Sequence, residues 1–159
     1  MSQNKYNNFS LRLYSRYIMR IFIAGIMQGN KKELGIHSQD YRERITSHLR
    51  TIFPNVEIID PDLTDPNRLG YNNKEAEEMF FRYCKIAGEV DFLISFIPEA
   101  SMGSAIEMWV AHNAGIPILT ISPLRHNWVV RLLSLKVFSD LNTFEQEFGI
   151  HLLKKLKLM

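Results

Sequence analysis

The sequence lacks the features that mark secreted, membrane-bound or nucleic-acid-binding proteins. Its single cysteine, Cys84, excludes an intramolecular disulfide and suits a reducing compartment, so we expect a cytoplasmic protein. No apolar run approaches the roughly 18 residues that a membrane-spanning helix needs, and the amino end is too polar for a secretory signal. The formal net charge of +2 gives no electrostatic reason to expect nucleic acid or a membrane as the main partner.

Two kinds of binding motif are also missing. The chain has no GxGxxG after its first predicted strand, which excludes the dinucleotide-binding fingerprint. His37, His48 and Cys84 do not have the spacing of metal ligands, so we expect neither a metal nor an organic cofactor. Cys84 lies in the middle of a predicted helix without an obvious base beside it, which argues against a nucleophilic role.

What the sequence does contain is an alternation of short apolar runs and amphipathic segments. The runs rich in β-forming side chains lie at residues 20–24, 56–59, 90–97, 116–121 and 137–138. They show no polar alternation, which predicts strands that are covered on both faces. We therefore expect a three-layer α/β sandwich with five parallel strands in the order 2-1-3-4-5.

The segments between these strands predict helices. Their expected ranges are residues 38–53, 73–88, 104–113, 128–135 and 144–156. In the first helix Tyr41 and Ile45 recur at helical spacing, so Arg42, Arg44 and Arg50 are assigned to a solvated face.

The chain is expected to form one domain. Its 159 residues suffice for a real hydrophobic core, and no internal repeat or low-complexity linker divides it. Residues 1–18 are polar and irregular, so we predict an N-terminal extension before a domain at residues 19–159.

The segment at residues 90–123 carries most of the functional information. It reads as a right-handed strand–helix–strand unit with Glu107 in the first helical turn, beyond the carboxyl end of a strand. One interpretation is a capping box, in which Ser104 and Glu107 only start the helix. In the other, Glu107, Ala111 and Ala114 face the sheet, and a shielded carboxylate near a helix amino end is a usable nucleophile.

The spacing of residues around Glu107 points to a known family. The segment contains Glu99, Ser101, Gly103, Glu107, Ala111 and Gly115, followed by an apolar strand. It resembles the active-site segment of the nucleoside 2-deoxyribosyltransferase superfamily. The resemblance implies a flavodoxin-like sheet, a small-molecule nucleoside or nucleotide as partner, and Glu107 as the nucleophile that attacks a deoxyribose. It further implies that Ser101 and Gly103 hold the sugar or its 5′-phosphate.

Other positions are assigned through the same resemblance, and several depart from the family pattern. The family's tyrosine in the first strand falls on Phe22, which lacks the hydroxyl group. The serine and arginine of the monophosphate hydrolases fall on Ile26 and Gln28. The aspartate that holds the base falls on Tyr83, and Glu77 is the second candidate for general acid.

Loop residues after the strands complete the predicted site. Gly25 would let the backbone approach a ligand, although a plain turn is the favoured explanation. Asp60 could contact a ribose hydroxyl or a metal, although an Asp-Pro turn series is the favoured explanation. Tyr71 offers a surface on which a base can stack. The loop at residues 122–127, which ends at Asn127, could hold a phosphate beyond the fourth strand.

These assignments favour cleavage of an N-glycosidic bond in a nucleoside or nucleoside 5′-monophosphate, through a glycosyl ester on Glu107 that water opens. If a second nucleobase intercepts the ester, the protein is a deoxyribosyltransferase, and the two differ in water access. The departures at Phe22 and Tyr83 leave a non-catalytic nucleotide-binding module as the alternative. The resemblance also implies a homodimer or larger oligomer, and the apolar residues 108–110 support an exposed contact surface.

Overall fold

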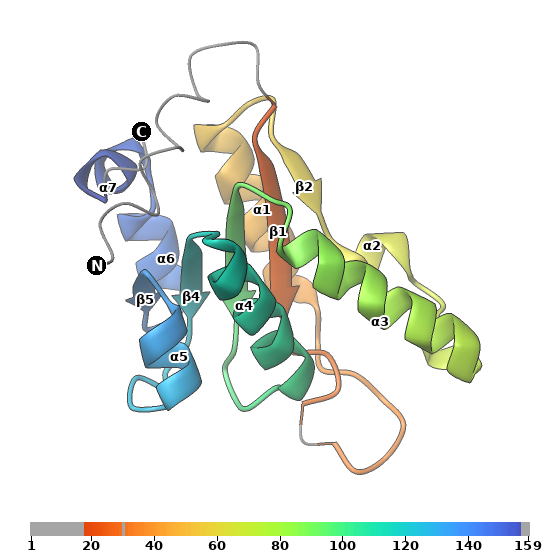
Figure 1. The fold of residues 1–159 in the computed structure, drawn as a ribbon. Coiled ribbons are helices and arrows are strands. Elements are labelled where there is room, and N and C mark those ends of the chain that lie inside the picture. Colours follow the sequence, from red (N-terminus) through yellow and green to blue (C-terminus); the bar gives the residue numbers. More distant parts are fainter. Residues whose placement is uncertain (1–17, 30, 157–159) are drawn as a thin grey trace.

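The computed structural model describes residues 18–29 and 31–156, which form a parallel sheet between two layers of helices (Figure 1). The predicted N-terminal extension, apart from Ile18, lies outside the described residues. The elements in chain order are β1 (Arg20–Gly25), α1 (Asp40–Ile52), β2 (Glu57–Ile59), α2 (Pro61–Thr64), the 3₁₀ helix η1 (Arg68–Gly70), α3 (Asn73–Ala87), β3 (Phe92–Phe96), α4 (Met102–Ala114), β4 (Ile118–Ile121), α5 (Trp128–Leu133), β5 (Lys136–Phe138), α6 (Leu141–Glu147) and α7 (Ile150–Lys155).

The sheet has the strand order β2-β1-β3-β4-β5, and every neighbouring pair is parallel. This confirms the predicted flavodoxin-like order. The chain first moves outward from β1 to β2 and then returns to place β3 on the other side of β1. Gly25 at the end of β1 pairs with Phe96 at the end of β3. Loops leave these two strand ends in opposite directions, which opens a space where ligands bind in such folds.

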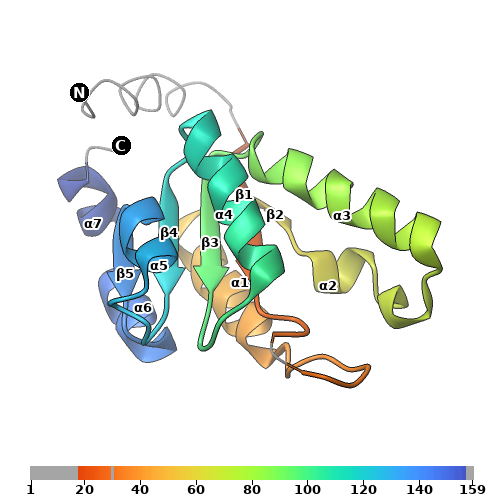
Figure 2. The ribbon, with the colours of Figure 1, turned by 60° about the horizontal axis from the view of Figure 1, so that its bottom comes forward.

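Alternate side chains of the strands supply two separate cores. Ile21 and Ile23 of β1 pack in the core that α1, α6 and α7 cover, whereas Phe22 and Ala24 pack in the core beneath α3 and α4. The two helical layers lie on opposite faces of the sheet in Figure 2. The central strands β1, β3 and β4 are mostly buried on both faces, as their apolar runs predicted. The edge strands β2 and β5 are only partly buried, so the prediction of full cover is wrong for them.

Helix α1 has a wider buried face than its apolar spacing predicts. Tyr41, Ile45 and Leu49 are buried as expected. The assignment of Arg42 to a solvated face is wrong, because Arg42 is only 3% exposed, and Thr46 one turn later is also buried. The Arg42 side chain lies in the interior because an ion pair with Asp60 compensates its charge there.

The predicted closing helix is in fact two helices, α6 and α7. They are separated at Phe148, whose backbone is extended, and at Gly149. Glycine is a poor helix former, and the break turns the Phe148 side chain into the core. Leu153 is fully buried, whereas Leu152 and Leu156 are only partly buried.

Large apolar side chains remain exposed on helices α3, α4 and α5. Phe81, Trp109 and Trp128 are 62%, 56% and 74% exposed, respectively. The expected exposure of residues 108–110 thus applies to Trp109, whereas Met108 is fully buried. In the same helix Ala111 is buried as predicted, but Ala114 is exposed. None of the helices in the described ranges has the length and apolar character that a membrane span requires.

Candidate active site

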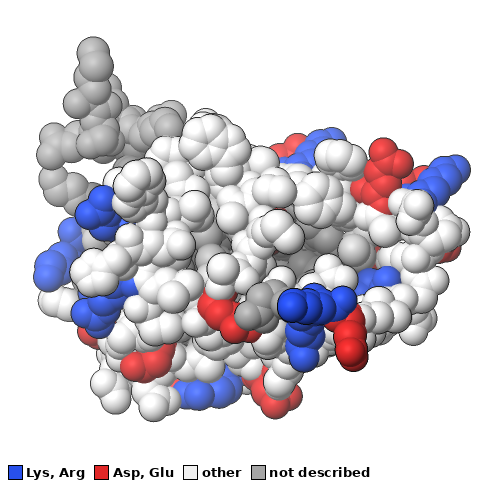
Figure 3. Space-filling model, turned by 90° about the horizontal axis from the view of Figure 1, so that it is seen from below, with Lys and Arg blue, Asp and Glu red and all other residues white. Residues whose placement is uncertain are grey.

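A pocket of about 240 Å³ lies beyond the carboxyl ends of β1 and β3. Its walls come from β1 and the following loop, from α1, α3 and α4, and from the start of α2. The lining residues are mostly uncharged, with Arg42 and Glu107 as the charged side chains among them. Figure 3 views the molecule from the side on which the strands end, where stretches of uncharged surface separate groups of charged side chains.

Glu107 reaches this pocket because α4 begins earlier than predicted. Ser101 is the N-cap of the helix, and its Oγ accepts a hydrogen bond from the Ser104 amide at 3.5 Å. The proposed capping box of Ser104 and Glu107 is therefore wrong, and Glu107 lies in the second helical turn. Within the described ranges, its carboxylate makes no hydrogen bond. Glu107 is thus not engaged at the helix start and lines the pocket instead.

The surroundings of Glu107 favour its neutral form. Burial raises the pKa of Glu107 from 4.5 to about 8, although the nearby positive charge of Arg42 acts in the opposite direction. The helix dipole gives little help, because its effect falls off within the first turn and Glu107 lies in the second. A carboxyl group with a pKa of about 8 is only about one-tenth ionised at pH 7.

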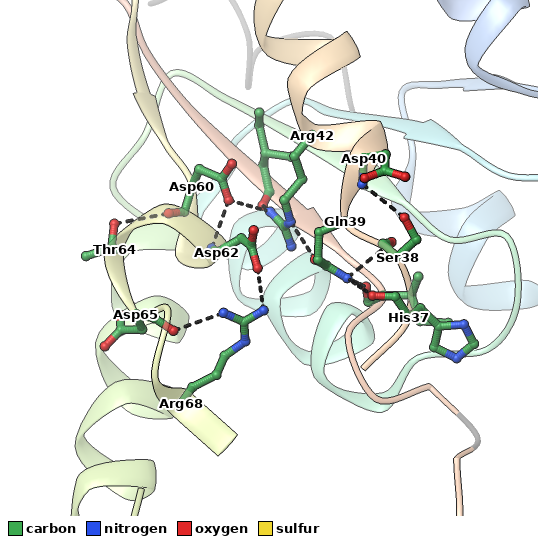
Figure 4. Close-up of polar contacts among 12 residues, drawn as sticks. His37, Ser38, Gln39, Asp40, Arg42, Asp60, Asp62, Thr64, Asp65 and Arg68 are labelled. Atoms are coloured by element: carbon green, nitrogen blue, oxygen red, sulfur yellow. Dashed lines mark hydrogen bonds and ion pairs between the residues drawn. The ribbon is translucent and has the colours of Figure 1, made fainter. Parts of the chain in front are cut away.

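Arg42 is held rigidly at one side of the pocket. Its Nε donates to Gln39 Oε1 at 2.7 Å, and its Nη1 donates to the Ile23 carbonyl at 2.8 Å and to Asp60 Oδ1 at 3.0 Å. Figure 4 shows Arg42 between Gln39 and Asp60. Asp60 also caps α2 by accepting from the Asp62 amide at 2.9 Å, so the predicted Asp-Pro turn is present. The turn alone does not account for Asp60, because the same carboxylate also accepts a hydrogen bond from Arg42 of α1.

Tyr83 on α3 lines the pocket and is anchored by Asp65. The Tyr83 hydroxyl donates to Asp65, which also accepts from the Tyr71 hydroxyl at 2.8 Å and from Arg82. Partial burial works to raise the pKa of Asp65, but the hydrogen bonds from Tyr83, Tyr71 and Arg82 outweigh it and lower that pKa. Burial and the bond to Asp65 raise the pKa of Tyr83. The Thr64 and Arg82 side chains act on the same hydroxyl group and work to lower its pKa, so Tyr83 is held in a polar network at the edge of the pocket.

The predicted site residues divide into those that line this pocket and those that do not. The lining includes Gly25, Gln28, Tyr83, Ser101, Gly103 and Glu107. Phe22 is fully buried and stacks against Tyr83 with ring centroids 5.9 Å apart, so it supports the wall from behind. Asp60 and Tyr71 act one layer further out, on Arg42 and Asp65, respectively.

Two predicted residues lie away from the pocket. Glu77 is exposed on α3 and is not part of the lining. Asn127 caps α5 by accepting from the amides of Val129 and Val130. It borders a neighbouring hollow of about 380 Å³, which shares Ser101 with the first pocket.

Sequence reasoning missed several lining residues, of which Arg42 is the most important. Met79, Phe80 and Met102 were also missed, and they give the pocket an apolar wall. A weak signal for Arg42 existed, since Arg42, Thr46 and Leu49 recur at helical spacing beside the apolar stripe. Among the residues that the structure describes, no group of three or more His, Cys, Asp and Glu side chains is placed to hold a metal ion.

Comparison with known proteins locates the fold. No protein-family model and no curated protein sequence matches the chain. A 2-deoxyribosyltransferase from Bacillus psychrosaccharolyticus superposes with a TM-score of 0.61 at 16% identity, over 84% of this chain and 95% of that one. The chain has the fold of a 2-deoxyribosyltransferase.

Two further solved structures superpose on the chain. A conserved protein from Enterococcus faecalis aligns with a TM-score of 0.57 at 15% identity, over 82% of this chain and 97% of its own. A CMP N-glycosidase from Clostridium botulinum aligns with a TM-score of 0.48 at 17% identity, over 80% and 96%. The resemblance seen in the segment around Glu107 is thus confirmed for the fold, by the neighbours with the higher scores.

Proposed function

We propose that the protein cleaves the N-glycosidic bond of a nucleoside, with Glu107 as the nucleophile. The observation that carries this proposal is the Glu107 carboxyl group in a pocket at the switch point of the sheet, unused by the helix start. The fold shared with a 2-deoxyribosyltransferase supports the same chemistry.

In this mechanism, a Glu107 carboxylate oxygen bonds to the anomeric carbon while the carbon–nitrogen bond breaks. The base leaves with that electron pair and takes up one proton from solvent, and a glycosyl ester remains on Glu107. Water then attacks the anomeric carbon, gives its proton to solvent and releases the free sugar and the carboxylate. If a second base attacks instead, the outcome is transfer of the deoxyribose.

The other pocket residues have supporting roles. Ser101 and Gly103 at the start of α4 would surround the sugar, and Tyr83 on α3 would form part of the wall that meets the base. Arg42 is the one cation in the described lining, and Asp60 already pairs with it. This charge balance favours an unphosphorylated nucleoside over a 5′-monophosphate. Glu77 has no role in the proposal, because it is exposed outside the pocket.

We also propose that the protein acts as a homo-oligomer in which copies meet through α4 and α5. Trp109 of α4 and Trp128 and Leu132 of α5 are each more than half exposed. An apolar surface of this kind is typical of a protein–protein contact. It lies close to the site, because α4 carries both Trp109 and Glu107.

The test is base release from a panel of nucleosides and nucleoside monophosphates, measured by chromatography with and without a second base. Glu107→Gln should lower turnover by at least about a thousandfold, because loss of a nucleophile removes several kcal/mol of barrier stabilisation. Glu77→Gln is the matched control, because Glu77 is an exposed glutamate of α3 outside the pocket lining, and it should retain wild-type turnover. A substrate-derived mass on Glu107 after rapid quenching would identify the ester.

Two results would overturn the proposal. Wild-type turnover in Glu107→Gln would exclude Glu107 as the nucleophile. Binding of nucleosides without base release across the whole panel would support the nucleotide-binding module instead, for which the missing hydroxyl at Phe22 is the main argument.

A further inference from the structure

One nitrogen of the Arg42 guanidinium group makes no hydrogen bond within the described part of the chain. Its Nε and Nη1 are bound by Gln39, the Ile23 carbonyl and Asp60, but Nη2 is buried without a partner among the described residues. The side chain is 3% exposed, so bulk water does not satisfy the two N–H groups. A buried unpaired donor on a charged group destabilises a fold, because its hydration is lost without replacement. Such a group is expected to serve a ligand or a side chain in the adjoining pocket.

The pocket offers a specific acceptor for this nitrogen. Arg42 and Glu107 line the same cavity, from α1 and α4, respectively, and the positive charge of Arg42 acts on Glu107 across it. Glu107 has no hydrogen-bond donor of its own among the described residues. One side of the pocket therefore has a fixed cation with a free donor, and the other has a carboxyl group with a free acceptor.

The remaining titratable groups near Glu107 do not provide this charge. Tyr41 lies beside Arg42 on α1, and Tyr83 and Cys84 face the region from α3. All three are neutral in the physiological range, because burial raises the pKa of each. Asp60 forms an ion pair with Arg42 on another side of the guanidinium group. Arg42 is the cation of this group.

We propose that Arg42 is a positioning residue for Glu107: when Glu107 ionises, its carboxylate turns toward Arg42 and accepts a hydrogen bond from Nη2, which stabilises the ionised form inside the pocket. Gln39, Asp60 and the Ile23 carbonyl fix the guanidinium so that Nη2 keeps its place. The inference rests on the proposed function only for the consequence in turnover, since the charge on Glu107 can be measured without a substrate.

The experiment titrates Glu107 directly by ¹³C NMR of protein labelled at the glutamate side-chain carboxyl carbons. The Glu107 signal is identified by its absence from Glu107→Gln. Two variants shift the local charge in opposite directions. The double variant Arg42→Gln with Asp60→Asn removes the ion pair without leaving one partner buried alone, and Asp60→Asn by itself leaves Arg42 unopposed. Arg44→Gln is the matched control, because Arg44 is an exposed cation two residues away on α1.

The expected midpoint of Glu107 rises by about one pH unit in the double variant, since a nearby opposite charge lowers a carboxyl pKa by about 1–3 units. It falls in Asp60→Asn, which leaves the Arg42 charge unopposed, and stays at the wild-type value in Arg44→Gln. If the double variant does not fold, the downward shift in Asp60→Asn remains a sufficient test. On an active substrate, the acidic limb of the kcat/KM profile moves with the midpoint, and the alkaline plateau stays within about threefold.

A Glu107 midpoint that is the same in wild type, the double variant and Asp60→Asn would overturn the inference. A rise in KM for the double variant without any change in the Glu107 midpoint would mean that Nη2 binds the substrate and not Glu107. That result would also overturn the inference. Absence of base release from the wild type would count against the proposed function alone, because the titration does not depend on turnover.

Discussion

The strongest test of the environment of Glu107 is the effect of pH on stability. Burial raises the pKa of this carboxyl group from 4.5 to about 8, so the folded protein holds the proton more tightly than the unfolded chain does. The stability that this proton contributes is fully present below about pH 4.5 and is lost as the pH rises to about 8. A glutamine at position 107 cannot titrate, so Glu107→Gln should remove this pH dependence.

The size of the effect follows from the pKa. Each unit of difference between the folded and unfolded states corresponds to about 1.36 kcal/mol. For a pKa of about 8 in the folded state, the loss of wild-type stability between pH 5 and pH 9 amounts to about 4 kcal/mol. The unfolding free energy of Glu107→Gln relative to that of the wild type should therefore rise by about this amount between pH 5 and pH 9. At pH 9 the variant should be the more stable protein.

Urea denaturation at pH 5, 7 and 9 measures the difference in unfolding free energy, in which titrations common to both proteins cancel. Glu77→Gln is the control, because its exposed side chain should give the same difference at each pH. A difference in unfolding free energy between wild type and Glu107→Gln that is the same at all three pH values would contradict this prediction. It would mean that water in the pocket solvates the carboxylate as well as bulk solvent does.

Two further predictions concern the pocket wall and the exposed apolar surface. In Gly25→Ala the new Cβ would lie 2.9 Å from Cζ of the buried Tyr41 ring, so we expect the unfolding free energy to fall by about 1–3 kcal/mol in urea denaturation. Gly103→Ala is the control, because a Cβ at that position meets no atom within 4 Å and should leave the stability unchanged. Light scattering at micromolar concentration should give a mass above the 18.6 kDa of one chain. Trp109→Lys places a charge on the exposed apolar surface and should lower the measured mass. A wild-type mass equal to that of one chain would contradict the proposed oligomer.

The sheet could be predicted because its signal is local and repeated. Each strand is an apolar run bounded by turn residues, and the strand–helix–strand handedness then limits the order. The place of Glu107 beyond the third strand followed from the same argument. The first residue of α4 could not be predicted, because Ser101 and Ser104 are both good N-cap residues and the sequence alone does not choose between them.

Arg42 could not be found from the sequence for a different reason. Helical spacing assigns an arginine to the solvent unless its partner is known, and the partner Asp60 lies 18 residues away on another element. The break in the closing helix at Gly149 has a similar origin, since the apolar spacing continues across it. Both errors concern side chains whose burial depends on tertiary partners.

The two outer strands of the sheet determine how copies of this protein can meet. β2 and β5 are each three residues long, and Pro61 follows β2 closely. Such short edges offer too few free backbone groups to template another strand, and proline ends the ladder. Within the described part of the chain, the edges of the sheet therefore disfavour its growth from one molecule to the next. The proposed oligomer would then form through side chains of the helices, where contacts are specific and the assembly can close.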